Sequence, residues 1–312
     1  MKIVFLDSAT MGDTPLSPIS ALGELECFER STPEDALARV GECEVLIVNK
    51  VRVNRDLLDA APKLRLVCEA ATGVNNIDTA LCASRGIAVR NVAAYSTESV
   101  VQTTFMHILS LLGCAPYLDS VVKNGSYSAS GLFTDVSKRI VEADGKTIGI
   151  VGMGTIGHRV ASVAEAFGMK VIYFSTSGTN HCTDYPAVTL DELLSRSDVV
   201  TVHAPLNERT NGLIGAAELR RMKPTAFIVN MGRGGIVEEK ALAEAVDEGV
   251  IAGAALDVFT SEPLPADSPL LAVKHPERFR FTPHTGWASA EARLRLVEGI
   301  AANISTFYEK RP

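Results

Sequence analysis

Three polar residues with complementary chemistry each stand a few residues beyond a short apolar run in the second half of the chain. They are Arg233, Glu262 and His284. An arginine can hold a carboxylate through two parallel hydrogen bonds and polarise a neighbouring carbonyl. A histidine can give or take a proton near neutral pH, and a carboxylate beside it favours the protonated ring and fixes its orientation. Together the three are the set that reduction of a 2-keto acid requires, provided that a cofactor supplies the hydride.

A glycine motif predicts where that cofactor binds. Gly152, Gly154 and Gly157 form a G-x-G-x-x-G pattern with Thr155 and Ile156 between the last two glycines. The motif follows an apolar run and opens a helical pattern, which is the context that dinucleotide-binding folds require. The first glycine permits a tight turn, the second lets the backbone approach a pyrophosphate, and the third lets the helix pack close to the strand. The sequence therefore predicts a dinucleotide whose phosphates lie at a helix N-terminus.

The position that normally distinguishes NAD from NADP is unusual. An acid is expected about 20 residues after the glycine motif, where it binds the adenosine ribose. Ser175 occupies that place, and no lysine or arginine follows until Arg196. The segment Ser175–Asn180 therefore neither repels a 2′-phosphate strongly nor offers it a cation. We expect NAD(H) as the cofactor, with NADP(H) not excluded.

Short apolar runs alternate with helical patterns along the whole chain, which predicts an α/β fold with parallel sheets. Strands are expected at 3–6, 45–48, 66–69, 87–89, 146–151, 171–174, 199–202, 226–229, 252–256 and 279–281. Helices are expected at 97–112 and 289–308. Because the carboxyl ends of parallel strands share one edge, Arg233, Glu262, His284 and the glycine loop are expected along the same edge. The runs could form one large sheet or two, and the glycine motif near residue 150 favours two, because the first part of the chain precedes it entirely and needs its own core.

The bulk composition restricts the possible partners. The 312 residues include 46% hydrophobic and 21% charged residues, and the formal net charge is −7. A negative chain of this kind argues against a broad nucleic-acid or acidic-membrane surface. No C-x-x-C pair, zinc-spaced cluster, signal peptide or 20-residue apolar span is evident. We expect a cytoplasmic protein that acts on a small molecule and binds no metal.

A series of further motifs resembles the D-isomer-specific 2-hydroxyacid dehydrogenase family along essentially the whole chain. The matching segments are Ala71–Asp78, Tyr95–Val100, the glycine motif, His203–Leu206, Met222–Pro224, Asn230–Gly235, Ala255–Phe259, Glu262–Pro265 and Thr282–His284. Tyr95–Thr97 and Trp287–Ser289 most resemble the members called glycerate dehydrogenases or hydroxypyruvate reductases. Ser175, in place of the usual acid, is the departure from the family pattern.

The resemblance implies a role for each matching residue. It implies that Arg233 anchors the substrate, that His284 is the general acid/base, and that Glu262 is its partner. On the substrate side it implies contacts from Thr72, Gly73, Val74 and Trp287. On the cofactor side it implies contacts from Gly152, Gly154, Thr155, Ile156, Gly157, Ser175, Pro205, Met231, Asp257 and Gly286, with Asp257 meeting the carboxamide.

The resemblance also implies the organisation of the molecule, namely two doubly wound, Rossmann-like domains with the active site in the cleft between them. A discontinuous substrate domain would comprise residues 1–98 and 285–312, and the dinucleotide-binding domain would comprise residues 99–284. Members of the family are usually dimers joined through the segment after the 97–112 helix. The polar stretch 126–135 is therefore expected to be a linker or an arm, with Leu132 and Phe133 contacting a second subunit.

Other functions on the same fold remain open at this point. A formate-type dehydrogenase would resemble a pattern with glutamine where Glu262 stands, so Glu262 counts against it. A phosphite-type dehydrogenase is a second alternative. A dinucleotide-sensing binding protein of the corepressor kind is a third, although the chain has no basic patch or extra tail of the sort such a role would use. The activity expected first is NAD(H)-dependent hydride transfer to a small 2-keto acid, such as hydroxypyruvate or glyoxylate, giving the D-2-hydroxy acid.

Overall fold

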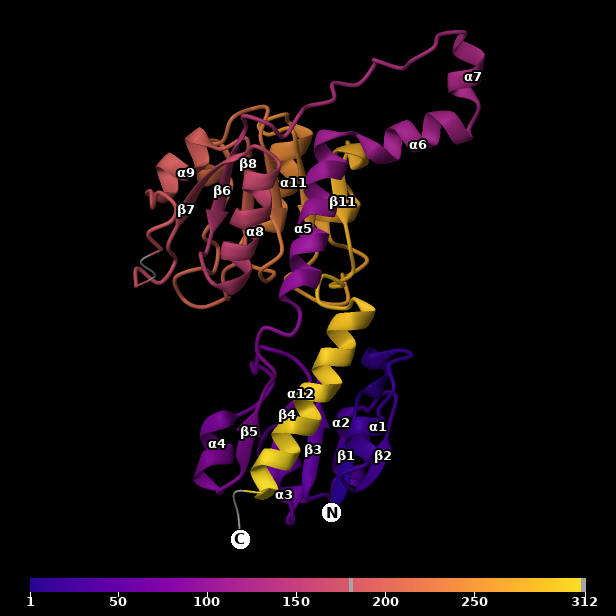
Figure 1. Ribbon diagram of the computed structural model, residues 1–312, viewed down its shortest axis with the longest axis vertical. Helices are drawn as coiled ribbons and strands as arrows, with labels where there is room; N and C mark the ends of the chain where they lie inside the picture. The colour runs from indigo at the N-terminus through magenta and orange to yellow at the C-terminus, as the bar shows by residue number, and fades with distance from the viewer. Residues whose placement is uncertain (180–181, 310–312) are drawn as a thin grey trace. The chain divides into compact units, whose positions relative to one another are not determined.

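The computed structural model describes residues 1–179 and 182–309, so Asn180, His181 and the last three residues lie outside it. The chain divides into two compact units (Figure 1). One unit comprises Met1–Ser96 with Ala288–Pro312, and the other comprises Thr97–Trp287. The chain thus passes between units after Ser96 and after Trp287. The domain boundaries expected from the sequence lie after residues 98 and 284, two residues later and three residues earlier.

The first unit contains a five-stranded parallel sheet in the order β2-β1-β3-β4-β5. Its strands are β1 (Lys2–Phe5), β2 (Glu24–Cys27), β3 (Val45–Val48), β4 (Leu66–Glu69) and β5 (Ala88–Arg90). Its helices are α1 (Ser17–Ser20), α2 (Pro33–Arg39), α3 (Arg55–Ala60), α4 (Thr79–Ser84) and α12 (Ala290–Glu309), with a short 3₁₀ turn η1 at Ser8–Met11.

Local sequence explains these elements. β3 is wholly buried, as expected for a central parallel strand covered on both faces. α2 begins at a capping box, in which the Thr32 side chain accepts from the Asp35 N–H and the Asp35 carboxylate accepts from the Thr32 N–H. α12 returns from the far end of the chain to pack against α1 and β4.

The second unit contains a six-stranded parallel sheet in the order β11-β10-β9-β8-β6-β7. Its strands are β6 (Thr147–Val151), β7 (Lys170–Phe174), β8 (Val199–Val202), β9 (Phe227–Asn230), β10 (Gly253–Leu256) and β11 (Phe279–Phe281). Its helices are α5 (Thr97–Leu112), α6 (Ala115–Lys123), α7 (Ser126–Ser130), α8 (Thr155–Ala166), α9 (Leu190–Arg196), α10 (Ala216–Leu219) and α11 (Glu239–Asp247), with 3₁₀ turns η2 (Pro269–Leu271) and η3 (Pro276–Arg278).

Helices cover both faces of this sheet. One core cluster joins α5 and α8 to the sheet through residues such as Ile108, Ile150 and Val160. The other joins α9, α10 and α11 through residues such as Leu193 and Leu242. The strand order reverses at β6, which has β7 on one side and β8 on the other. Open α/β sheets bind ligands beyond the carboxyl ends of the strands at such a reversal.

The prediction of two parallel-sheet α/β domains is confirmed, with one strand missed. β2 was not expected, because its sequence Glu-Leu-Glu-Cys lacks an apolar run. It lies at the edge of its sheet, pairs only with β1, and is at most half-buried. The stretch after residue 123, expected as a linker or an arm, contains the short helix α7.

Among the described residues, no single helix has the length and apolar composition needed to cross a membrane. Only α5 and α6 taken together have that length and composition, and the pair is bent by 64° at its junction.

Candidate active site

The glycine motif lies at the strand-order reversal, between β6 and α8. Gly152 has φ +97°, and a Cβ there would lie 3.0 Å from the backbone nitrogen of Ala204. A Cβ on Gly157 would lie 2.3 Å from the carbonyl oxygen of Gly152, so the helix can approach the strand only because this residue is glycine. Both glycines therefore do what the motif predicts for them.

The N-terminus of α8 is open toward a ligand. Gly154 is the residue that precedes α8, and no side chain caps the first N–H groups of the helix. A Cβ on Gly154 would meet no atom within 4 Å, and Gly154 and Thr155 are exposed, with Ile156 half-buried beside them. Uncapped N–H groups beside open space suit a phosphate. These residues therefore fit the pyrophosphate of a dinucleotide.

The polar candidates follow three neighbouring strands. Arg233 comes after β9, Glu262 after β10 and His284 after β11, and these strands are adjacent and parallel. The three residues thus emerge at the same carboxyl edge as the glycine loop.

His284 and Glu262 form a direct pair. The Nδ1 of His284 lies 2.7 Å from the Oε2 of Glu262, and the other carboxylate oxygen accepts from the N–H of Phe259 at 3.1 Å. The two side chains are 23% and 29% exposed, so the pair is partly shielded from water yet reachable by a small molecule. A carboxylate held in this way fixes the imidazole and stabilises its charged form. In the described part of the chain the Nε2 of His284 has no protein partner, which leaves it available to a ligand.

The backbone at His284 is unusual. Its φ is +53°, a conformation that non-glycine residues adopt rarely and that clusters at functional sites. The carboxylate of Asp257 holds this segment in place by accepting from the Thr282 hydroxyl at 2.6 Å, the Thr285 N–H at 2.9 Å and the Gly286 N–H at 2.8 Å. Asp257 therefore positions the segment that carries His284, a role additional to the cofactor contact predicted for it from the sequence.

A histidine outside the predicted set supports the same segment. His107, on α5, lies with its Nε2 2.9 Å from the hydroxyl of Thr282. Burial lowers the pKa of His107, while the charge of Asp257 acts in the opposite direction. His107 is thus connected through the Thr282 hydroxyl to the Asp257 carboxylate, and these polar contacts hold the segment that carries His284. No motif in the sequence indicated this contact, because α5 and β11 are separated by most of the second unit.

Arg233 is exposed and has no carboxylate partner in the described part of the chain. Its Nη1 donates only to the adjacent Gly232 carbonyl at 2.8 Å. Asn230 closes the loop by donating to the Arg233 carbonyl and accepting from the Gly232 N–H. The loop is tight, since a Cβ on Gly234 would overlap the backbone of Phe259. A guanidinium presented on such a loop can hold an anionic substrate through two hydrogen bonds.

The remaining predicted contacts occupy varied environments. Met231 and Gly286 are buried, and a Cβ on Gly286 would lie 2.9 Å from the Met231 side chain. Pro205 is exposed after β8, and Trp287 is half-buried at the end of the second unit. Ser175 follows β7, and its Oγ is shielded from solvent and has no hydrogen-bond partner in the described ranges 1–179 and 182–309.

His203, in the loop that starts after β8, stays neutral. Its Nε2 lies 2.9 Å from the Thr201 hydroxyl, and burial lowers its pKa well below the usual value. A neutral ring adds no positive charge beside the glycine loop.

The predicted substrate contacts Thr72, Gly73 and Val74 follow β4 in the first unit. The hydroxyl of Thr72 donates to the Val92 carbonyl at 3.1 Å, and the Asn91 side chain donates to the Thr72 carbonyl. Gly73 and Val74 are half-buried. The loop is thus anchored through Thr72 at the carboxyl end of its own sheet.

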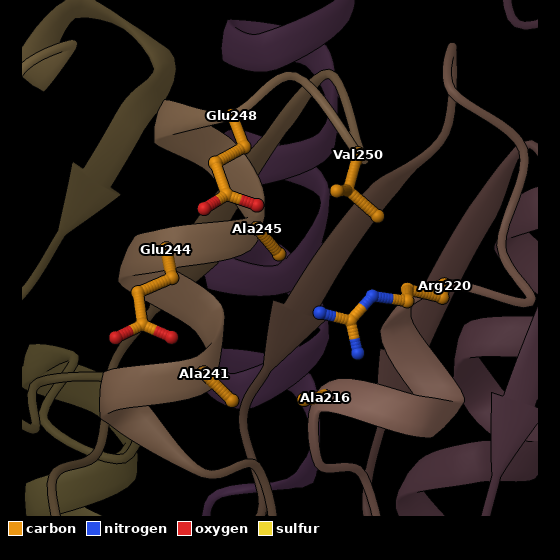
Figure 2. A pocket seen from close by; sticks show the side chains of 7 residues that line it. All are labelled: Ala216, Arg220, Ala241, Glu244, Ala245, Glu248 and Val250. Carbon is orange, nitrogen blue, oxygen red and sulfur yellow. The ribbon is translucent and has the colours of Figure 1, made fainter.

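Two other features are separate from this site. A hollow of about 40 Å³ lies between α10 and α11, lined by Ala216, Arg220, Ala241, Glu244, Ala245, Glu248 and Val250 (Figure 2). Glu248 and Val250 directly precede β10, so the hollow lies at the opposite end of the sheet, and it is too small for a substrate. Elsewhere in the described residues, His158, Cys182 and Asp184 have ligand atoms within 4.8 Å of one another, a spacing that could hold a metal ion.

Comparison with known proteins decides the family. The model of the D-isomer specific 2-hydroxyacid dehydrogenase NAD-binding domain matches residues 105–286. The chain belongs to this family. A hydroxypyruvate reductase of Blautia hydrogenotrophica is 34% identical over 321 residues, covering 100% of this chain and 98% of that protein. A glycerate dehydrogenase of Methylorubrum extorquens is 34% identical over 317 residues, covering 100% and 97%.

The fold agrees with solved structures of the family. An NADPH-dependent glyoxylate/hydroxypyruvate reductase of Sinorhizobium meliloti, solved with citrate, superimposes with a TM-score of 0.85 at 26% identity, covering 99% of this chain and 95% of that chain. As a 2-hydroxyacid dehydrogenase, the protein is an oxidoreductase acting on CH–OH donors with a nicotinamide dinucleotide.

Proposed function

We propose that this 2-hydroxyacid dehydrogenase reduces hydroxypyruvate or glyoxylate to the corresponding hydroxy acid with NADH, and catalyses the reverse oxidation. The observation that carries the proposal is the His284–Glu262 pair, 2.7 Å apart, on the strand edge that also presents the unpaired Arg233. The names of the relatives agree with small 2-keto acids as the substrate class.

Each residue has a distinct task in the proposed reaction. Arg233 binds the substrate carboxylate and polarises the carbonyl at C2. When bound, the nicotinamide supplies the hydride to that carbon. His284 gives a proton from Nε2 to the carbonyl oxygen, so that the product is a neutral alcohol, and in the reverse direction it takes the proton back. Glu262 stabilises the charged imidazole and keeps Nδ1 facing away from the substrate.

The other predicted contacts complete the proposed site. We assign substrate binding to the backbone around Thr72–Val74 and to Trp287. Cofactor binding is assigned to the glycine motif and to the predicted contacts Ser175, Pro205, Met231 and Gly286. Asp257 keeps the Thr282–Gly286 segment in place by three hydrogen bonds, and a carboxylate has room for a further donor such as the carboxamide.

The protein is also proposed to be a cytoplasmic homodimer that binds neither nucleic acid nor membranes. The net charge of −7 supports the latter part. Support for a dimer comes from the arm segment, defined here as residues 126–140. Leu132, Phe133, Val136 and Ile140 are 67%, 91%, 82% and 54% exposed there. Such a group of exposed apolar side chains is typical of an interface.

A panel of 2-keto acids tests the activity. Hydroxypyruvate, glyoxylate, pyruvate and a larger 2-keto acid are each supplied with NADH, and NADH oxidation is followed by absorbance. We expect the highest kcat/KM for hydroxypyruvate or glyoxylate. Tight NADH binding without turnover of any keto acid would instead favour a dinucleotide-sensing protein.

A further inference from the structure

A cation that is distant in the sequence, Arg209, contacts the segment after β7. Arg209 belongs to the loop that follows β8, yet its Nη1 donates to the carbonyl oxygen of Ser177 at 2.9 Å. Ser177 stands two residues after Ser175, the position where dinucleotide-binding folds bind the adenosine ribose. Arg209 is 34 residues beyond Ser175 in the sequence, and the two segments meet because the loop after β8 contacts the loop after β7.

The loop that carries Arg209 has a fixed shape. Asn207 accepts from the N–H of Arg209 at 2.9 Å, and the buried Thr210 donates to the carbonyl of Pro205 at 2.6 Å. Thr210 also accepts from the N–H of Asn207 at 2.9 Å. These bonds hold the base of the Arg209 side chain, so that less conformational entropy is lost when its guanidinium binds an anion.

The charge of Arg209 is not neutralised by the protein. In the part of the chain that the structure describes, no carboxylate pairs with its guanidinium, and of the five N–H donors only one has a protein acceptor. The exposed Arg159, Arg221 and Lys63, by contrast, all have carboxylate partners. A guanidinium without a carboxylate partner, bonded to the segment that follows the expected ribose-binding position, suits a phosphate monoester.

The turn beneath Arg209 carries hydroxyl groups and no acid. The Oγ of Ser175 is shielded and has no hydrogen-bond partner among the described residues, so a change of rotamer toward a ligand breaks no hydrogen bond there. The Oγ of Ser177 accepts from the N–H and the hydroxyl of Thr179 at 3.2 and 2.9 Å, and retains its own proton for donation. With no carboxylate from Ser175 to Thr179, nothing in this turn repels a doubly charged group.

We propose that Arg209, Ser175 and Ser177 form a binding site for the 2′-phosphate of NADP(H), so that the protein uses NADPH as well as NADH. The proposal rests on the function proposed above for the dinucleotide site, but it concerns binding of the adenosine end and not turnover of the keto acid. It revises the expectation from sequence that the segment has no cation to offer.

Binding of adenosine fragments tests the site without the reaction. Isothermal titration calorimetry of the whole protein with 2′,5′-ADP and with 5′-AMP distinguishes the contribution of the 2′-phosphate to binding from that of the rest of the nucleotide. We expect 2′,5′-ADP to bind about tenfold to a hundredfold more tightly than 5′-AMP, as for a charge-assisted contact. Arg209→Gln should abolish that difference, whereas Arg220→Gln, an exposed arginine at the opposite end of the sheet, should leave it unchanged. Equal affinities for the two fragments in the unaltered protein would overturn the proposal.

Kinetics with both cofactors provides the second measurement. Arg209→Gln should lower kcat/KM for NADPH by about tenfold or more and leave that for NADH within about twofold. Ser175→Asp, which introduces a carboxylate at the ribose position, should also lower kcat/KM for NADPH. Equal losses with both cofactors would show that Arg209 contacts the adenine or the shared ribose instead, and would overturn the proposal. If 2′,5′-ADP binds as expected but no keto acid is reduced, the proposed reaction fails while the phosphate site stands.

Discussion

Arg233 presents a planar cation whose only acceptor in the part of the chain that the structure describes is its neighbour Gly232, and this is the basis of its proposed role. Arg233→Lys keeps the charge but loses the two-pronged geometry. We expect kcat/KM for the keto acid to fall by about 30- to 150-fold, which corresponds to about 2–3 kcal/mol. The Kd for NADH, measured by fluorescence titration, should change little. The matched variant Arg220→Lys should be neutral, and an Arg233→Lys enzyme with full efficiency would show that the anchor lies elsewhere.

Glu262 acts through His284, so its effect should appear in the chemical step. Glu262→Gln preserves the size of the side chain and removes the charge that stabilises the imidazolium. We expect kcat to fall by about a hundredfold, with little change in KM for the keto acid or Kd for NADH. Stopped-flow single turnovers separate this step from product release. Glu248→Gln, also exposed but at the other end of the sheet, serves as the control, and an unchanged single-turnover rate would contradict the assignment.

The predictable residues are those whose position follows from the strand pattern. Arg233, Glu262 and His284 each stand just beyond an apolar run, so parallel strand order alone placed them on one edge. Arg209 and His107 could not be found in this way. Their contacts join loops or helices that are far apart along the chain, and only the packed structure brings Arg209 to Ser177 and His107 to Thr282.

At the scale of elements, long apolar runs were predictable and short or exposed elements were not. The helix predicted over 97–112 has the bounds of α5, and the strand predicted over 199–202 has those of β8. β2 was missed because an edge strand with alternating acids buries too little to leave an apolar signature. α6 and α7 were not predicted and bury no residue, although the apolar residues of α6 do recur with helical spacing.

The carboxyl end of β4 contains a buried acid that should make stability depend on pH. Glu69 is fully buried, and only one of its oxygens has a hydrogen-bond partner among the residues described, accepting from the Asn76 amide at 2.9 Å. Burial raises the pKa of Glu69 to about 8, and the nearby charge of Asp7 adds to the effect of burial. Between pH 4.5 and about 8 the folded state therefore keeps a proton that the unfolded state has lost. Stability from this group is present below pH 4.5 and is lost as the pH rises toward 8.

Glu69→Gln removes this dependence because glutamine stays neutral. We expect the free energy of unfolding of the unaltered protein to contain a decrease of up to about 1.4 kcal/mol per pH unit from Glu69 within that window. The variant should lack that decrease and be the more stable protein at pH 8. Urea unfolding at pH 5, 6, 7 and 8 measures the difference. Glu298→Gln, an exposed acid on α12, should keep the slope of the unaltered protein, and parallel curves for the Glu69 variant and the unaltered protein would refute the interpretation.

At the scale of the whole molecule, the arm segment has a defined shape although α7 within it, and α6 just before it, contain no buried residue. The hydroxyl of Tyr127 donates to the Phe133 carbonyl at 2.7 Å, and the hydroxyl of Tyr117 donates to the Asp135 carboxylate at 3.1 Å. These polar contacts hold the segment in place, and Phe133 within it is 91% exposed. Such a segment is better suited to a preformed interface than to a mobile loop. A second copy of the chain is the occupant that the family resemblance implies.

Phe133→Asp tests this dimer, because a charge at the centre of an apolar interface must be desolvated without a partner. We expect the unaltered protein to sediment as a dimer at micromolar concentration and the variant to shift toward the monomer, with a dimer Kd raised about tenfold or more. Leu271→Asp places the same charge on a 57%-exposed apolar residue outside the arm and should leave the dimer intact. Circular dichroism establishes that both variants fold. A monomer for the unaltered protein would remove the dimer proposal, and a dimer unaffected by Phe133→Asp would place the interface outside the arm segment.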